Sequence, residues 1–477
     1  MKSSQDVVIV GAGIIGSSIA RQLSQYQLNI TLLDQASDVS CGTTKANSAI
    51  IHAGYDAKPQ TLQAKYNVQG SLLWPLLAKE LAFPYRQLGS LVLSFDEKQD
   101  EILKELLNRG QQNGVSGLEI WNQKKILREE PALSSRVHSA LYAPSAAIVC
   151  PYQAAIALTE NAIHNGVTWL PSYPVKKISQ DKDGFVINDE IHTRYLINAS
   201  GVNSDKVAAL IGDTSFTISP RRGEYLILDK QQLVNHVLFQ TPTPLGKGVL
   251  LAPTVDGNVL LGPTAIDCKD PTDTQVTQNG IDLILSQAKT ILKDPVPPVI
   301  SGFAGIRALA GDDFIVGPSQ VHPHFFNCAG IGSPGLASSP AIALAIRDYL
   351  QEAGLKLIEK PDFDPCRHQR LPIHSLSNRN KDLLIQENPN YGKIVCRCET
   401  ISEQEIIDAI TAELPALTLD GLKRRLRVGM GRCQGGFCTP RLLRLLEQYG
   451  HLKPAQINKN EPGSNLIYNE TKGARHA

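Results

Sequence analysis

The stretch VVIVGAGIIGSSIA, residues 7–20, decides the fold of this chain of 477 residues. A strand expected over residues 7–10 leads through a glycine turn into a helix over residues 17–25, and a second strand over residues 30–33 ends at an acid. This order predicts a βαβ unit with the GxGxxG fingerprint, whose glycines allow a tight turn, close approach of a pyrophosphate and helix packing. The helix N-terminus would attract phosphates, and the acid would hold a ribose hydroxyl. The residues assigned to this site are Gly11, Gly13, Ile14, Ile15, Gly16 and Asp34.

The composition excludes several classes of protein. Lys and Arg total 47 against 46 for Asp and Glu, so the net charge of +1 gives no electrostatic reason to expect a nucleic-acid partner. The length suits two or three folding units. No uncharged apolar run of about 18 residues or more follows the opening, so we expect no transmembrane helix. Glycines in the apolar opening argue against a signal peptide. Nine cysteines, four of them in the last fifth, favour a reducing compartment and metal ligation, so we expect a cytoplasmic protein.

The rest of the chain divides by pattern. Amphipathic helices are expected between residues 60 and 142, and the apolar runs GEYLIL, VLLAPT and NVLLGPT predict an antiparallel sheet. A strand, a glycine turn and a helix from about Ser338 close the main domain, 1–358. Residues 359–391 have little periodicity and are expected to form a linker, followed by a small cysteine-bearing domain, 392–452, and a polar, poorly ordered tail, 453–477.

Two later segments bear on which dinucleotide is bound. One strand ends in NASG, residues 198–201, and a further glycine turn, GIGSPGL, spans residues 330–336. A nicotinamide-dependent enzyme would complete its nucleotide-binding fold within a short stretch of sequence. Two further candidate segments so far along the chain instead suit binding of a long, permanently held FAD. Taken singly, each turn is also explained by simple loop geometry.

Several motifs resemble one flavoprotein family. CGTTKANSAIIHAGYD (residues 41–56), SGFAGIRALAG, GPT (262–264) and AGIGSPGLASSP are similar to motifs of the FAD-dependent family of D-amino-acid oxidase, sarcosine oxidase and glycerol-3-phosphate dehydrogenase. The resemblance covers residues 1 to about 355. Within the family it is nearest to bacterial glycerol-3-phosphate dehydrogenases and L-2-hydroxyglutarate oxidases, and the latter share RGEY, residues 222–225.

The resemblance implies an α/β fold and a set of FAD contacts. A Rossmann-like FAD-binding domain would comprise residues 1–75, 145–215 and 300–358, with an inserted antiparallel-sheet substrate domain from residues 76–144 and 216–299. The GIGSPGL turn would present backbone N–H groups and a helix N-terminus to the flavin. The implied contacts are Thr43, Thr44, Ser48, Val175 (through its backbone), Ala199, Gly201, Gly332, Ser333, Gly335 and Leu336.

The candidate catalytic residues are a base and a cation. His52, which the IIHAGYD motif places beside the flavin, is the candidate base because imidazole titrates near neutral pH. An anionic substrate needs a fixed cation, so Arg307 in GIRA is the first choice and Arg222 the second. Either arginine could instead be structural, Arg307 through Asp312 or Asp313, and Lys247 could close over a phosphate. Aerobic glycerol-3-phosphate dehydrogenases carry an arginine where this chain has Asp56. The phosphate contacts of those enzymes therefore cannot all be transferred to this chain, and other cations would have to bind a phosphate.

Four cysteines form the second candidate centre. The pattern is Cys396-x-Cys398 followed by Cys433-x4-Cys438, with a helix, a loop and a helix expected between the pairs. Structural zinc normally takes a wider pair spacing than C-x-C, and the compartment disfavours disulfides. A [2Fe–2S] cluster needs four thiolates, and the glycines of RVGMGRCQGGFC would let N–H groups approach the sulfurs. CRCET and GMGRCQGGFC resemble the bacterioferritin-associated ferredoxin-type [2Fe–2S] domain. The other five cysteines are expected to be packed thiols.

Together the motifs predict an FAD and [2Fe–2S] dehydrogenase. The resemblance implies oxidation of sn-glycerol 3-phosphate to dihydroxyacetone phosphate, with electrons passed on to a second flavoprotein subunit or to a membrane-bound acceptor subunit and quinone. Such a partner would hold the protein at the inner face of the membrane. L-2-hydroxyglutarate or a secondary amine of the opine kind remains an alternative substrate. An alternative of another class is a non-catalytic electron-relay subunit.

Overall fold

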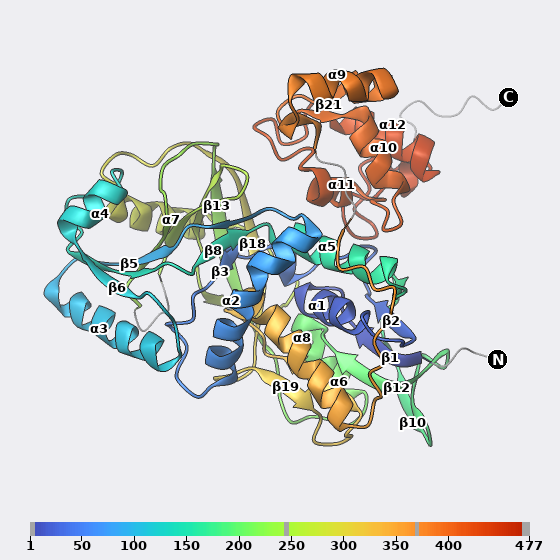
Figure 1. Cartoon of the computed structure of the whole chain (residues 1–477). Coiled ribbons are helices and arrows are strands. Elements are labelled where there is room, and N and C mark those ends of the chain that lie inside the picture. Colours follow the sequence, from blue (N-terminus) through green and yellow to red (C-terminus); the bar gives the residue numbers. More distant parts are fainter. Residues whose placement is uncertain (1–4, 243–247, 368–371, 470–477) are drawn as a thin grey trace. The chain divides into compact units, whose positions relative to one another are not determined.

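The computed structural model describes residues 5–242, 248–367 and 372–469 (Figure 1). By internal contacts the chain forms two units, one of residues 1–35 and 39–367 and the other of residues 36–38 and 368–477. Lys247, a candidate phosphate contact, lies outside the described residues.

The first unit is built on an eight-stranded sheet whose central strands are parallel. Every residue of β2 (Ile30–Leu33), which reads ITLL, is buried, as is typical of a mainly apolar strand inside a parallel sheet. In spatial order the strands are β10 (Ile178–Asp181), β11 (Gly184–Ile187), β12 (Ile191–Asn198), β1 (Gln5–Val10), β2 (Ile30–Leu33) and β9 (Thr168–Leu170), with β20 (Phe325–Ala329) beside β12 and β19 (Ile315–Pro318) beside β20.

Helices pack against this sheet and against one another. The first helix starts three residues earlier than predicted and packs between two others, α5 and α8. A Cβ on Gly16 would lie 1.8 Å from the Gly11 carbonyl oxygen, so glycine is required where the helix meets the turn. The helices of this part are α1 (Ile14–Leu23), α2 (Leu62–Leu81), α5 (Pro151–His164), α6 (Ser204–Ala209) and α8 (Gly335–Glu352), with short 3₁₀ turns η1 (Thr43–Lys45) and η2 (Gly201–Asn203).

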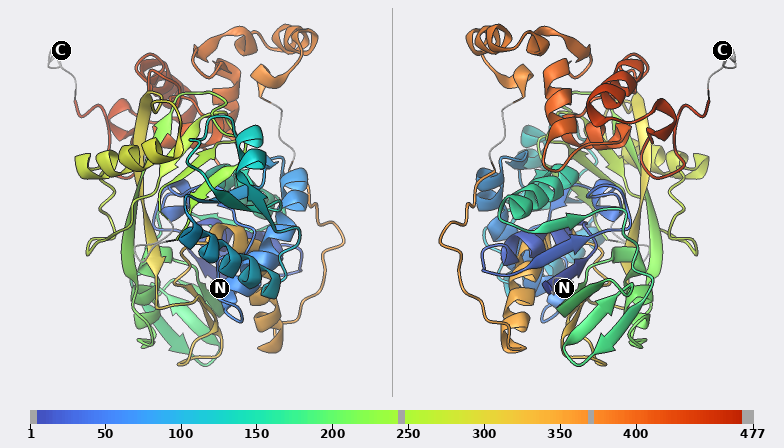
Figure 2. Two further views of the ribbon diagram at one scale, coloured as in Figure 1. Left: turned by 90° about the vertical axis from the view of Figure 1, so that its left-hand side faces the viewer. Right: turned by 90° about the vertical axis from the view of Figure 1, so that its right-hand side faces the viewer.

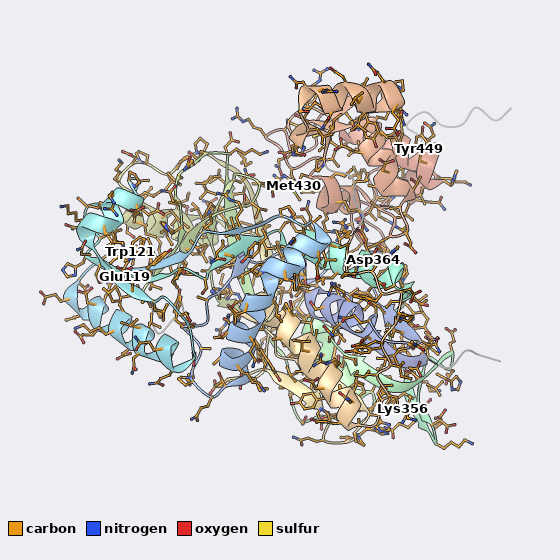
Figure 3. All side chains as sticks on the ribbon, viewed as in Figure 1. Glu119, Trp121, Lys356, Asp364, Met430 and Tyr449 are labelled. Atoms are coloured by element: carbon orange, nitrogen blue, oxygen red, sulfur yellow. The ribbon has the colours of Figure 1, made fainter. Side chains whose placement is uncertain are left out.

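A nine-stranded sheet forms the other half of this unit (Figure 2). It is antiparallel except for one parallel pair, β14 with β5. Trp121, labelled in Figure 3, lies in the apolar core of this sheet and donates from Nε1 to Glu119 (3.0 Å). In spatial order the strands are β17 (Ile266–Asp267), β13 (Ser219–Leu228), β16 (Val259–Gly262), β15 (Leu250–Pro253), β14 (Val237–Gln240), β5 (Ser90–Ser94), β7 (Ser139–Ala143) and β6 (Glu119–Asn122), with β18 (Val299–Leu309) beside β13.

Smaller elements complete the first unit. The helices around the nine-stranded sheet are α3 (Glu97–Gln112), α4 (Gln123–Glu129) and α7 (Gln278–Ile291). A three-stranded sheet contains β3 (Ile50–Ile51), β8 (Ala147–Val149) and β4 (Tyr85–Gln87). The predicted α/β class, with a parallel nucleotide-type sheet and an inserted, mainly antiparallel sheet, is confirmed.

The second unit is a small, mostly helical core. Its apolar residues include Ile406, Leu422, Leu446 and Ile457, all fully buried. Ser402 and Glu405 form a reciprocal capping box that fixes the start of α10. Its elements are η3 (Ile373–Ser375), α9 (Asn378–Glu387), η4 (Pro389–Gly392), β21 (Ile394–Cys396), β22 (Ile401–Ser402), α10 (Glu403–Thr411), α11 (Leu419–Leu426), α12 (Thr439–Gly450) and η5 (Pro454–Gln456).

Two expectations about the ends of this unit differ from the structure. The predicted linker contains the helix α9, capped by Ser377, and no residue of that helix is buried, which explains why the sequence shows no apolar periodicity there. The predicted tail begins with η5 and the buried Ile457, so its first residues belong to the core. None of the helices in the described ranges is both long and apolar enough to cross a membrane.

Candidate functional site

The first glycine turn forms a cradle at the end of β1. Gly11 has φ +108°, and a Cβ there would lie 2.4 Å from the Ala199 carbonyl oxygen. The helix α1 begins at Ile14 without a side-chain cap at Gly13 and without an acid in its first turn. Its N-terminal N–H groups therefore offer the partial positive charge that a phosphate requires.

Two side chains reach this turn from other segments. Thr44 Oγ1 accepts from the Ile14 N–H (2.9 Å), and Asp34 Oδ2 accepts from the Ala12 N–H (2.7 Å). Both predicted contact residues thus lie at the turn, together with Ile15 in the first helical turn. A hydroxyl beside the helix N-terminus and an acid at the end of β2 fit the pyrophosphate and the ribose of a dinucleotide.

The second glycine turn, residues 330–336, also leads into a helix whose N-terminus has no side-chain cap. The helix α8 begins at Gly335, directly followed by Leu336, and Pro334 provides no side-chain cap. The Gly335 N–H donates to the Gly332 carbonyl (2.6 Å), so the turn that contains Ser333 is tight. This N-terminus also lacks an acid in its first turn, and it can stabilise negative charge on a bound cofactor.

The remaining predicted FAD contacts lie near the ends of the parallel strands. Ala199 follows β12 and donates to the Val10 carbonyl (2.9 Å), and Gly201 begins η2 with φ +60°. Val175 is partly buried against the core beside β1 and β2. The structure therefore gathers these residues at the sheet end where α/β proteins bind nucleotides.

Residues 43–48 connect the nucleotide turn to the second sheet. Thr43 Oγ1 donates to the Ile306 carbonyl (2.6 Å), and a Cβ on Gly305 would lie 1.8 Å from the Ala46 carbonyl oxygen. Ser48 Oγ lies 3.3 Å from the Tyr225 hydroxyl. Glycine at position 305 is thus required for β18 to approach this segment.

The two candidate arginines lie on opposite faces of the second sheet. In the antiparallel pair β13 and β18, Arg221 is opposite Arg307 and Tyr225 is opposite Phe303. Opposite residues share a face, and successive residues alternate. Arg307 and Tyr225 therefore share the face on which residues 43–48 pack, whereas Arg222 lies on the other face.

Arg222, the second-choice cation for an anionic substrate, is engaged in ion pairs. Its Nη1 donates to Asp273, and its Nη2 lies 3.2 Å from Glu224, which is fully buried. Glu224 in turn accepts from the Thr277 N–H (2.9 Å) at the start of α7. These contacts favour the structural alternative for Arg222, because its charge is balanced by two acids.

Arg307 is placed differently. Its Nη2 donates to the Thr264 carbonyl (3.0 Å), and within residues 5–242, 248–367 and 372–469 it forms no ion pair. Asp313, one of its proposed structural partners, instead accepts from the Leu62 and Gln63 N–H groups (2.8 and 2.9 Å) at the start of α2. Arg307 is half-buried, and no carboxylate among the residues that the structure describes compensates its charge, which suits an arginine that binds an anion.

His52 lies just after β3. Its carbonyl accepts from Asn67 Nδ2 (2.6 Å), and its ring stacks on Phe239 with centroids 5.6 Å apart. Only three residues separate it from Ser48, so one segment carries both. His52 also lines an open pocket, together with Tyr55, Asp56, Val92, Leu106, Phe239, Gln240 and Pro242.

Tyr225 lies beside the predicted FAD contact Ser48 and is not among the residues predicted from the sequence. It is 3% exposed, its ring stacks on Phe303 (centroids 4.8 Å apart, 13° between planes), and its hydroxyl meets Ser48. The alternation of RGEYLIL, residues 222–228, in a strand places this tyrosine and Arg222 on opposite faces. That alternation indicates the face of each side chain but not the residues that pack against it.

The four cysteines of the second unit lie as two pairs. Cys398 Sγ is 3.7 Å from Cys433 Sγ, and the Cys438 thiol donates to Cys396. In the described part of the chain, no three His, Cys, Asp or Glu side chains converge as a site for a single ion. Two pairs of thiols suit two metal positions better than the one tetrahedral position of zinc.

Backbone N–H groups point at these sulfurs. The Cys438 thiol, with the Gly429 and Glu399 N–H groups, lowers the pKa of Cys396 to about 6. The Phe437 N–H, with those of Gly435 and Gly436, lowers the pKa of Cys433. Donors aimed at sulfur stabilise thiolates and tune a bound cluster, so the residues present fit a [2Fe–2S] group.

Of the five other cysteines, Cys150 and Cys328 are buried, as expected of packed thiols. Burial raises the pKa of the Cys328 thiol. Cys41 and Cys268 are partly exposed, and Cys366 is exposed, so the expectation of packing is wrong for Cys366.

Replacing Gly431 with alanine is expected to prevent cluster assembly. A Cβ there would lie 2.2 Å from Cys398 Cβ, so a ligand would be pushed away. Iron and acid-labile sulfide per chain should fall to a small fraction of the wild-type value. The matched control is Gly392→Ala in the same unit, where the new Cβ meets its nearest atom at an ordinary 3.4 Å. Equal iron contents in the two variants would contradict this prediction.

Comparisons with known proteins agree with both centres. Residues 6–349 match the family described as FAD dependent oxidoreductase, and residues 394–448 match the BFD-like [2Fe-2S] binding domain. A glycerol 3-phosphate dehydrogenase of Caloramator mitchellensis is 44% identical over 98% of this chain and 99% of its own length. An L-2-hydroxyglutarate dehydrogenase of Bos taurus is 29% identical over 73% of this chain and 89% of its own.

A solved structure shows the same fold. The dithionite-reduced L-alpha-glycerophosphate oxidase of Mycoplasma pneumoniae with FAD bound superposes with a TM-score of 0.73 at 31% sequence identity. The match covers 77% of this chain and all of that one.

Proposed function

Because the chain belongs to the family of FAD-dependent oxidoreductases and carries a BFD-like [2Fe-2S] binding domain, we propose that it oxidises sn-glycerol 3-phosphate to dihydroxyacetone phosphate. The observation that carries this proposal is the similarity to the Caloramator dehydrogenase along nearly the whole chain, the cysteine domain included. Arg307 shares a sheet face with Tyr225, which contacts Ser48, and it has no ion pair within the described residues; this supports an anionic substrate.

Each residue then has a defined task. The nucleotide turn at Gly11, with Asp34 and Thr44, would hold the FAD, which when bound supplies an acceptor for the hydride from C2 of the substrate. His52 takes the proton of the C2 hydroxyl, so that the alcohol becomes a ketone as the hydride departs. Arg307 holds the phosphate through charge-assisted hydrogen bonds and fixes C2 in place.

The cysteine centre supports a dehydrogenase rather than an oxidase. A cluster held by Cys396, Cys398, Cys433 and Cys438 would carry electrons singly, which suits transfer to a separate acceptor instead of to oxygen. We propose that this acceptor belongs to a partner, either a second flavoprotein subunit or a membrane-bound subunit that reduces quinone. In this proposal the chain is the catalytic subunit, which oxidises the substrate, and the partner is the subunit that accepts the electrons.

The test is anaerobic mixing of the oxidised holoprotein with sn-glycerol 3-phosphate while the flavin absorbance is followed. L-2-hydroxyglutarate and a secondary amine serve as parallel samples. Fast bleaching by glycerol 3-phosphate alone, followed by the electron-spin signal of a reduced cluster, is the expected result. Bleaching by another compound alone would replace the substrate, and no bleaching by any of them would favour an electron relay.

A further inference from the structure

One face of the helix α2 packs closely against the helix α8. Gly70 and Trp74 are buried against α8, where Trp74 Nε1 donates to the Ala337 carbonyl (3.1 Å). A Cβ on Gly70 would lie 2.2 Å from the same carbonyl oxygen, so the two helices are in close contact, side by side in Figure 1. This packing fixes which residues of α2 face outward.

The outward face has an unusual composition. Its exposed residues are spaced by four, three, four and three positions, which places them in one stripe along the helix. Leu72 is 71% exposed and Leu76 is 57% exposed, and the exposed Pro75 lies between them. The stripe consists of Lys65, Gln69, Leu72, Leu76 and Lys79.

The charges on this stripe all have one sign. A lysine lies at each end, and neither lysine forms an ion pair with any residue that the structure describes. Glu80 is the only acid between Leu62 and Leu81, and it is paired with Arg21 (2.6 Å). The stripe is therefore apolar in the middle and cationic at both ends, with no acid in it.

We propose that this stripe of α2 docks onto the anionic surface of a lipid bilayer. A helix lying in the membrane interface presents leucines to the acyl boundary and lysines to the headgroups, which is the order found here. Long lysine side chains can reach the headgroups while their stems cover apolar surface. Two lysines add electrostatic attraction to anionic lipid, whereas a complementary protein patch would have to supply acids around two leucines.

This binding does not depend on the proposed reaction, because it requires neither substrate nor electron transfer. It would bring the enzyme to the surface where an acceptor in the membrane is available. Its failure and the failure of the proposed function are therefore distinguishable: vesicle binding tests the stripe, and flavin bleaching tests the substrate.

The experiment is sedimentation of the full-length holoprotein with vesicles made of equal parts phosphatidylglycerol and phosphatidylcholine. We expect binding that is weakened by high salt and by vesicles of phosphatidylcholine alone. Leu72→Gln with Leu76→Gln should weaken binding by about tenfold or more, since the apolar contact is removed. Lys65→Gln with Lys79→Gln should also weaken it, and should abolish the salt dependence.

The matched control is Leu283→Gln, which changes another exposed leucine, 45% exposed, on α7 of the same unit. It should bind vesicles as the wild type does, and thermal melts should show all variants folded. Absence of wild-type binding to the anionic vesicles would overturn the proposal, as would equal binding by the double-leucine variant. Self-association of the wild type that the double-leucine variant loses, without vesicle binding, would identify a second copy of the chain as the occupant instead.

Discussion

Replacing His52 with glutamine is expected to slow flavin reduction by sn-glycerol 3-phosphate by about 10²–10⁴-fold, the usual contribution of a positioned general base. Glutamine keeps much of the side-chain volume beside Phe239, so the pocket that His52 borders should survive. The loss should appear in the rate of bleaching at saturating substrate under anaerobic conditions. Substrate affinity should change little, because the proposed contact for the phosphate is Arg307 and not His52.

The control for this prediction is His138→Gln, which alters a half-exposed histidine paired with Asp100 (2.7 Å) in the inserted domain. That variant should reduce its flavin at the wild-type rate. If His52→Gln also bleached at the wild-type rate, the hydroxyl proton would have to leave by another route. An amine substrate, whose oxidation needs no alkoxide-forming base, would then become the better hypothesis.

The sequence predicts the backbone geometry of the first glycine turn well because its signals are local. A glycine turn between a strand and a helix dictates backbone geometry within a few residues, and Gly11 indeed has a left-handed φ that only glycine adopts readily. The four cysteines are a similarly specific signal, since two closely spaced pairs of thiols are typical of a metal or cluster site. Which acids neutralise which arginines depends instead on strand register, and no local pattern encodes it.

Arg222 and Tyr225 illustrate this limit. The RGEY motif contains both, yet strand alternation directs the arginine to Asp273 and Glu224 and the tyrosine to Ser48. The helix α9 shows a second limit, because a helix without buried residues leaves no apolar period to detect. In both cases the missing information is what each side chain packs against, which only the folded chain supplies.

Replacing Arg307 with alanine is expected to raise the Michaelis constant for sn-glycerol 3-phosphate by about 10–150-fold, because a hydrogen bond to a charged group contributes about 1.5–3 kcal/mol. FAD content should stay at the wild-type level, since Arg307 has no predicted contact with the nucleotide. Arg307→Lys should recover part of the affinity, because it restores the charge without the bidentate fork. Steady-state kinetics and the flavin-to-protein absorbance ratio measure the two effects.

Arg222→Ala is the control for Arg307→Ala, because it removes an arginine from the same pair of strands, β13 and β18, but from the opposite face. It leaves the fully buried Glu224 without its cation, so it should destabilise the fold by about 3–5 kcal/mol, seen as a lower melting temperature. The protein that remains folded should keep the wild-type Michaelis constant, because Arg222 faces away from Ser48 and Tyr225. If the Michaelis constant instead rose in Arg222→Ala and stayed unchanged in Arg307→Ala, the assignment of the two faces would be reversed, and the anion would have to bind on the side of α7.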